Sequence, residues 1–461
     1  MAMGRSRKRQ QSLWVPTQIL AKAPGHPFYE RLSKLLAKHE FAEFAEKLCR
    51  PFYAETQGRP SIAPTVYFQT LLIGYFEGLE SERRIAWRIA DSFSLRTFLG
   101  LELADPTPNH STISRTRRLL GIDIHEAFFG WVLQILAKEG LLKGKTLGVD
   151  GTTLEADAAM RSIVRRDTGE GYKEFLKGLA KESGIEEPTD EELARFDRKR
   201  PKKMSNKEWR HPHDPDARIA KMKRGNTRMA HKAEHAVDME TGAIVAVTIQ
   251  PADRGDTKSL EETMTEVGEV LLDVLDDEEA ADSLGNELAR ELVTDKGYHS
   301  NEVLTKQSER GIRTYFAEPE RGLRNWKGKK EEQAAVYANR RRIRGERGSG
   351  LQKKRGELVE RSFAHCYESG AMRRVFLHGH ENIRKRILIH VAGFNLGLVL
   401  RKLCGFGTPR GLWDHFSSIN PHYSAFFEFL ESLCRPQTDL LRNRTSVVSF
   451  SILKWPCLHA A

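Results

Sequence analysis

Cysteine is scarce in this chain, and its few cysteines are not arranged for a shared role. The 461 residues include 5 cysteines, an odd number, widely spaced and never in a C-x-x-C pair: Cys49, Cys366, Cys404, Cys434 and Cys457. This spacing argues against both a disulfide framework and a zinc ribbon. We therefore expect reduced and mostly buried thiols.

Long apolar runs and phosphate-binding loops are also missing. The most apolar run, 387–400, is interrupted by His390 and Asn395. Because a membrane span needs about 20 apolar residues, this run predicts a buried helix and no membrane partner. The basic segment 1–27 has no apolar stretch after it, unlike a secretory signal, which predicts a flexible N-terminus and a cytoplasmic protein. No Gly-x-x-x-x-Gly-Lys-Ser/Thr loop occurs, which disfavours an ATP-driven motor and a nucleotide cofactor.

Positive charge is plentiful and concentrated in one segment. The chain has 74 lysines and arginines against 63 acidic residues, a formal net charge of +11. Residues 321–355 alone hold 13 basic side chains against three acids. Such a concentration attracts polyanions and favours DNA as the partner. The basic residues of this segment that we expect to contact DNA are Arg340, Arg341, Arg342, Arg344 and Arg355.

The first third of the chain has a helical pattern. Apolar residues recur at spacings of three and four over 28–142, with Pro64 suited to a first helical turn and Ser81 and Ser111 placed as caps. The pattern predicts an all-α, helix-turn-helix-like DNA-binding domain. Its last short helix, 111–120, carries the arginines expected to face DNA, which are Arg115, Arg117 and Arg118.

From Lys145 onward strands and helices alternate, which indicates a mixed α/β domain over 145–404. We predict a strand at 146–150, a hairpin from 236–237 and 243–250, a helix at 256–275, and strands at 291–294 and 313–316. The very polar stretch at about 160–226 is expected to be an inserted, partly disordered loop. Residues 405–461 give no pattern that can be assigned.

Three acids stand beside apolar elements. Asp150 and Asp295 each end a predicted strand, and Glu360 lies on a helix whose inward face would hold Val359, Phe363 and Cys366. Carboxylates are the ligands that Mg²⁺ prefers, with Mn²⁺ as a substitute. Two such ions support in-line displacement at phosphorus, with Asp150 bridging both ions as a hypothesis. Other acids compete for these roles: Glu155, Asp157, Asp253, Asp256 and Glu357, the last of which follows Gly356 and is expected to face solvent.

A zinc site is a weaker alternative. His231 and His235 have the spacing of a helical zinc pair, but they fall in a predicted strand and lack the intervening glutamate of a metalloprotease. The loop residues His211, His213, Asp214 and Asp216 offer at most an adventitious metal site.

The ordered motifs resemble those of bacterial insertion-sequence transposases of the InsH-type DDE group, over roughly residues 30–405. The motifs are Gly-Val-Asp-Gly-Thr (148–152), Thr-Asp-Lys-Gly-Tyr-His-Ser (294–300), Val-Glu-Arg-Ser-Phe-Ala (359–364), the later segment Gly370 to Arg374, and Gly58-Arg59-Pro60 through Thr112-Ile113-Ser114-Arg115. One departure concerns the helper residues of the family's Tyr-Arg-Glu-Lys signature, because Gly356 and Tyr367 stand at the expected arginine and lysine places.

The resemblance implies a ribonuclease-H-like catalytic domain, with the polar stretch inserted after its first strand. It implies catalytic metal ligands at Asp150, Asp295 and Glu360, and places Lys296 and Tyr298 near the scissile phosphate. It further implies cleavage at the ends of a mobile element and joining to target DNA, by a homo-oligomer that holds two ends. Two alternatives stay open: a nuclease of the same fold that cuts without joining, and a non-catalytic DNA-binding protein derived from a transposase.

Overall fold

The structure is a computed structural model that describes residues 25–54, 61–102, 104–200, 204–222, 225–285, 287–320, 322 and 324–412. The described residues belong to one compact unit. Nearly all of the N-terminal segment expected to be flexible, the Gly58-Arg59-Pro60 turn and most of the unassigned tail lie outside the described residues. In the described part the cysteines are free: Cys49 and Cys366 are buried and Cys404 is half-buried, as expected.

The N-terminal region is helical, as predicted. Its helices are α1 (Pro27–Lys38), α2 (Phe41–Cys49), the short η2 (Arg50–Phe52), α3 (Pro64–Phe76), α4 (Glu82–Ala90), α5 (Phe93–Phe98), α6 (His110–Leu119) and α7 (Ile122–Lys138). Pro64 opens α3, where the missing N–H costs no helical hydrogen bond. Ser81 caps α4 by accepting from the amide of Arg84. The predicted cap Ser111 is wrong, since Asn109 accepts from the Ser111 amide and caps α6.

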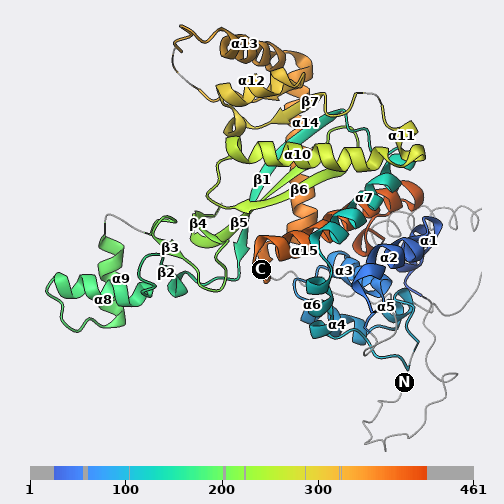
Figure 1. Ribbon diagram of the computed structural model, residues 1–461, viewed down its shortest axis with the longest axis horizontal. Coiled ribbons are helices and arrows are strands. Elements are labelled where there is room, and N and C mark those ends of the chain that lie inside the picture. Colours follow the sequence, from blue (N-terminus) through green and yellow to red (C-terminus); the bar gives the residue numbers. More distant parts are fainter. Residues whose placement is uncertain are drawn as a thin grey trace, which may run out of the picture. The chain divides into compact units, whose positions relative to one another are not determined.

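A seven-stranded mixed sheet forms the α/β part (Figure 1). Its strands are β1 (Thr146–Ala156), β4 (Arg218–Lys221), β5 (Thr227–Asp238), β6 (Ile244–Pro251), β7 (Glu291–Thr294), β8 (Arg313–Phe316) and β9 (Arg374–Val375). The order is β4-β5-β1-β7-β8, with β6 also on β5 and β9 on the far end of β1. β1 runs antiparallel to β5 and parallel to β7. The predicted hairpin and the strands at 291–294 and 313–316 are confirmed.

Helices cover both faces of this sheet. They are α10 (Asp256–Leu275), α11 (Glu278–Ser283), the short η4 (Lys296–Tyr298), α12 (Asn301–Glu309), α13 (Lys330–Arg344), α14 (Glu346–Phe363) with its π-helical extension η5 (Ala364–Ser369), and α15 (His380–Cys404). Successive strand residues point to opposite faces, so Asp150 faces Arg355 of α14 while Glu234 on β5 faces Ser259 of α10.

Both outer strands of the core are tied to helices by a buried asparagine. Asn339 of α13 bonds the amide and carbonyl of Phe316 on β8, each at 2.9 Å. Asn395 of α15 does the same for Ile244 on β6, at 3.0 and 2.8 Å. These side chains satisfy backbone groups that an edge strand otherwise leaves unpaired.

The N-terminal helices and the sheet share one hydrophobic core, which extends from Phe28 to Leu412. The run 387–400 is the buried middle of α15, as predicted. Two segments, 380–412 and the bent pair α6–α7, are long and apolar enough to cross a membrane, but 72% of the apolar 18-residue window of the first is buried inside the protein. Because one core spans both regions, the predicted domain boundary near residue 143 is a change from helices to strands within that core.

The polar insertion is more ordered than predicted. It contains η3 (Met160–Ser162), β2 (Val164–Arg165), α8 (Tyr172–Glu182), α9 (Asp190–Lys199) and β3 (Trp209–Arg210). Thr189 and Glu192 form a capping box that starts α9. Trp209 is buried and anchors a small core of its own. The expectation of a long loop was wrong because local capping and this core order polar sequence, and residues 218–221 already return to the main sheet as β4.

Candidate active site

The sheet brings Asp150 and Asp295 to neighbouring positions. In the parallel pair β1 and β7, Val149 lies opposite Thr294, and each is followed directly by an aspartate. Asp150 Oδ1 accepts from the amide of Gly151 at 2.8 Å, and Asp295 Oδ1 accepts from the amide of Gly297 at 2.8 Å. These backbone bonds fix the orientation of both carboxylates.

The surroundings of Asp150 disfavour the ionised form of its carboxyl. Burial raises the pKa of the Asp150 carboxyl above its ordinary value, and the nearby Asp295 raises it further. Arg355 of α14 acts to lower this pKa, because its Nη1 lies 2.6 Å from Asp150 Oδ2. Two hard oxygen ligands that repel each other at adjacent strand ends suit a divalent cation, which binds such carboxylates and offsets their repulsion.

The structure does not bring the third acid into the same cluster. Glu360 lies on α14 beside the buried Val359, and its side chain is exposed. The predicted inward positions Val359, Phe363 and Cys366 are buried. The rival Glu357 is exposed and forms an ion pair with Arg361 one turn further on. Within the described residues, no group of three or more acids, histidines or cysteines is close enough to hold a metal ion.

Sequence reasoning missed a buried polar network on the other face of β1. Glu234 is fully buried; its Oε1 accepts from Tyr298 and from Ser259, both at 2.7 Å, and lies 3.1 Å from Lys232 Nζ. Lys232 also reaches Asp256 at 2.6 Å. The signal that could have revealed it was the pair Lys232 and Glu234, opposite charges two residues apart and therefore on one face of a strand, since buried charges are usually paired.

This network determines the place of the loop that carries Asp295. Tyr298 belongs to η4, directly after Asp295, and is 1% exposed. Burial, followed by the charge of Glu234, raises the pKa of the Tyr298 hydroxyl well above its ordinary value, so it remains a donor. Tyr298 therefore anchors the loop in the interior, whereas Lys296, which follows Asp295 in the chain, is exposed.

The arginines of α6 divide into two kinds. Arg115 and Arg118 are exposed, as DNA contacts require. Arg117 is 6% exposed, forms an ion pair with Glu82 of α4 and bonds Asn382 of α15. Burial and pairing therefore remove Arg117 from the surface that the sequence pattern assigned to DNA.

The basic segment before Glu360 is also divided. Arg340 pairs with Glu318 at 2.8 Å, and Arg342 bonds the carbonyl of Thr314 at 2.8 Å. Arg341 and Arg344 are exposed. Half of these four arginines thus fasten α13 to the sheet, and the other half face solvent.

A hollow of about 420 Å³ lies beside the second half of β1, the strand that carries Asp150. Thr152, two residues beyond Asp150 and on the same face of β1, lines it together with Arg228 and Arg373. Arg373 Nη1 donates to Thr152 Oγ1 at 3.0 Å. Glu155 and Glu368 also line the hollow, and Arg373 pairs with Glu368 at 2.8 Å, so its walls carry charges of both signs.

The histidine pair has other partners. His231 Nε2 lies 3.1 Å from Asp214 Oδ2, and both side chains are buried. His235 lies between the hydroxyls of Ser362 and Tyr367, at 2.9 and 2.6 Å. Both residues lie on β5, where the spacing of four does not form a helical metal pair.

Two families match the chain. The family described as "Transposase domain (DUF772)" matches residues 18–119, and the family described as "Transposase DDE domain" matches residues 205–396. The second range contains Asp295 and Glu360, and Asp150 lies between the two ranges. Searches among curated proteins and among solved structures found no match.

The chain is thus a protein with a transposase DDE domain, built on a mixed sheet that aligns two aspartates. It belongs to the insertion-sequence DDE transposases, and DNA is the substrate that this family implies. The matches do not distinguish subgroups, so the InsH-type assignment stays a prediction.

Proposed function

We propose that this protein cuts DNA at the ends of its own mobile element and joins them to target DNA. The observation that carries the proposal is the pair Asp150 and Asp295, held at adjacent strand ends within a transposase family. The strand order, with β1 between antiparallel β5 and parallel β7, supports a ribonuclease-H-like arrangement of this catalytic part.

Asp150, Asp295 and Glu360 are the residues that would hold two Mg²⁺ ions, or Mn²⁺ in their place. Bound there, the ions would activate the attacking oxygen and neutralise the leaving one. Glu360 is included on the resemblance to the family alone, because its exposed side chain does not join the two aspartates in this structure. The exposed Lys296, Arg115, Arg118, Arg341 and Arg344 would bind phosphates, and so would Arg355 when it is not paired with Asp150.

Pairing of two element ends implies a homo-oligomer in the DNA complex. The same chemistry needs no nucleotide cofactor and no membrane, and it suits a cytoplasmic protein. A nuclease that cuts without joining, or a DNA-binding protein without catalysis, would give a different product pattern, so one assay separates the three.

The assay incubates purified protein with Mg²⁺ or Mn²⁺ and labelled DNA that carries both ends of its element. We expect cleaved and joined products from wild type. We expect Asp150→Ala, Asp295→Ala and Glu360→Ala each to lower the rate by roughly a thousandfold or more while DNA binding persists. Glu357→Ala is the matched control on the same helix, and its activity should stay near that of wild type.

Each other outcome selects another function. Cleavage without joining by wild type indicates the nuclease, and binding without cleavage indicates the non-catalytic protein. If Glu357→Ala is inactive while Glu360→Ala cuts normally, Glu357 takes the place of the third acid.

A further inference from the structure

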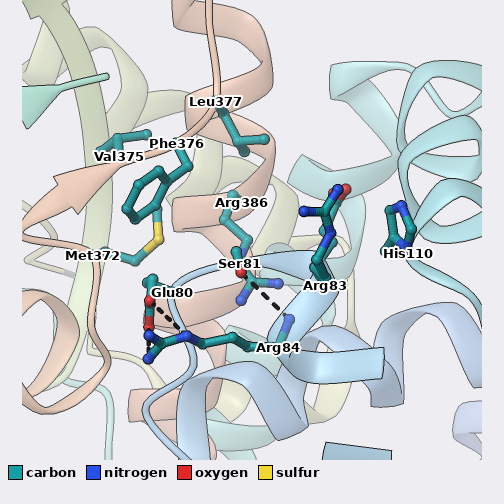
Figure 2. Close-up of a pocket in the computed structure, with 11 residues that line it drawn as sticks. Glu80, Ser81, Arg83, Arg84, His110, Met372, Val375, Phe376, Leu377 and Arg386 are labelled. Carbon is teal, nitrogen blue, oxygen red and sulfur yellow. Dashed lines mark hydrogen bonds and ion pairs between the residues drawn. The ribbon is translucent and has the colours of Figure 1, made fainter. Parts of the chain in front are cut away.

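A second cavity lies away from the three acids, between the start of α4 and the segment that follows η5 (Figure 2). Its volume is about 520 Å³, within the range of small-ligand sites, roughly 300 to 1,000 Å³. One wall is polar and holds Ser81 and Arg83, and the opposite wall is apolar and holds Met372 and Phe376. We name this cavity the α4 pocket.

A buried cation at this cavity has an unused donor. Arg386 of α15 is 3% exposed, and its Nη2 donates to the carbonyl of Leu79 at 3.2 Å. Its Nη1 is buried and has no hydrogen-bond partner among the described residues. Burial lowers the pKa of Arg386 to about 10, so it remains charged at neutral pH. An unmatched donor on a buried guanidinium is costly and indicates a missing anionic partner.

The acids at the cavity are already engaged. Glu80 pairs with Arg84 at 3.0 Å, and Glu82 pairs with Arg117. The exposed Arg83 extends its guanidinium along the polar wall, as Figure 2 shows. The N-terminus of α4, capped by Ser81, adds partial positive charge. The pocket therefore offers positive charge on one side.

The opposite wall suits a flat ring. Phe376 is 41% exposed, although most large aromatic side chains in this part of the chain are buried. Its ring lies beside Met372, on the other side of the cavity from Arg83 (Figure 2), and the guanidinium of Arg374 lies 5.4 Å from the ring centroid. An exposed aromatic face next to cationic groups is the arrangement on which nucleic-acid bases stack while their phosphates are held.

We propose that the α4 pocket holds one unpaired nucleotide, with its phosphate at Arg83 and Arg386 and its base against Phe376. This rests on the proposed function insofar as DNA supplies the nucleotide. β9, which precedes Phe376, pairs with Glu155 and Ala156 at the end of β1. Glu155 is five residues beyond Asp150, a strand length of about 17 Å. A single strand that leaves the acids along β1 thus reaches the pocket.

The test is a binding measurement on the full chain in chelator, without cleavage. The probes are a fluorescent single strand of deoxythymidines and the matching duplex, with thymidine 5′-monophosphate and inorganic phosphate as competitors. We expect Arg83→Ala and Phe376→Ala each to weaken single-strand binding by about tenfold. Arg83→Ala should also reduce the slope of log affinity against log salt concentration by the amount expected for about one phosphate contact. Phe376→Ala should leave that slope unchanged.

Trp87→Ala and Arg31→Ala are the matched controls, because Trp87 on α4 and Arg31 on α1 are exposed to solvent and do not line the cavity. They should bind the single strand within about twofold of wild type. If thymidine 5′-monophosphate competes in wild type but not in Arg83→Ala, while both proteins bind the DNA strand equally, the ligand of the pocket is a free nucleotide and not DNA.

The proposal is overturned if Arg83→Ala and Phe376→Ala bind every probe as wild type does. It is also overturned if they weaken duplex and single strand equally, which indicates surface charge alone. Repeating the measurement in Asp150→Ala separates the two proposals, because loss of cleavage leaves the pocket intact.

Discussion

Asp150 is a carboxylate whose surroundings oppose its own charge. Its burial and the nearby Asp295 raise its pKa, and the ion pair with Arg355 only partly offsets them. A raised pKa means that ionised Asp150 lowers the stability of the folded chain. The penalty is absent below the unfolded pKa of about 3.9 and is complete above the folded pKa. Ionised Asp150 therefore lowers the stability of the fold while its carboxylate is available to bind a ligand.

We predict that Asp150→Asn raises the melting temperature in chelator at pH 7.5, and that the gain shrinks as the pH approaches 4. Mn²⁺ should raise the melting temperature of wild type but not of the variant, since binding to the folded state stabilises it. Differential scanning calorimetry measures both effects. A lower melting temperature for Asp150→Asn in chelator would show that the Arg355 ion pair outweighs burial and repulsion.

Asp277→Asn is a control of opposite sign. Although burial acts to raise it, bonds from Lys138 and from the Ala280 amide lower the pKa of Asp277. Its ionised form therefore stabilises the fold above the unfolded pKa, and that contribution is lost as the pH falls through the folded pKa. We expect Asp277→Asn to lower the melting temperature at pH 7.5.

At the scale of elements, α14 packs on β1 at a glycine. A Cβ at Gly148 would clash with Met239 Sδ at 2.5 Å and would make ordinary contacts at 3.4 Å with both Arg355 Cγ and Val359 Cγ2. Glycine therefore leaves room for the buried Met239 side chain beside the helix that carries Arg355 and Glu360.

Gly148→Ala should destabilise the protein by about 1 to 3 kcal/mol, because the added methyl overpacks this contact. The helix α7 offers the matched control Gly130→Ala, where a Cβ meets nothing within 4 Å. That change should raise the free energy of unfolding by roughly 0.5 to 1 kcal/mol, since alanine favours the helix. Urea unfolding compares the two, and equal effects of both substitutions would contradict the close-approach argument.

At the scale of the whole molecule, neutral histidines are buried at three separate junctions. Burial lowers the pKa of His125 to about 4 and that of His235 to about 3, and it lowers the pKa of His390 well below its ordinary value. His125 connects α7 to α3 through Tyr67 at 2.9 Å. His390 connects α15 to the end of η5 through the carbonyl of Gly370 at 3.0 Å.

These residues predict a steep acid sensitivity. A histidine with a depressed folded pKa is neutral in the fold but takes up a proton when unfolded, so stability falls as the pH drops through about 6.5. Three such groups give a slope of about 4 kcal/mol per pH unit between pH 6 and 5. Urea titrations at several pH values measure it. His235→Asn should lower the slope by about 1.4 kcal/mol per pH unit, and a flat profile would show that these histidines remain protonated in the fold.

The sequence by itself determined most of the elements. Alternating and apolar stretches predicted the strands 291–294 and 313–316 and the helix 256–275 at their observed bounds. Local rules suffice here because side-chain periodicity and turn chemistry act over a few residues. The ordered acidic motifs also led to the transposase family, which the family matches confirm.

The tertiary structure decided which polar residues are available. Arg117 and Tyr298 belong to sequence patterns typical of DNA contacts, yet ion pairing and burial place them inside the molecule. The pairing of Arg355 with Asp150 and the core around Trp209 likewise depend on residues far apart in the chain. A sequence pattern fixes the period of a side chain along its own element, but only packing between elements determines what that side chain meets.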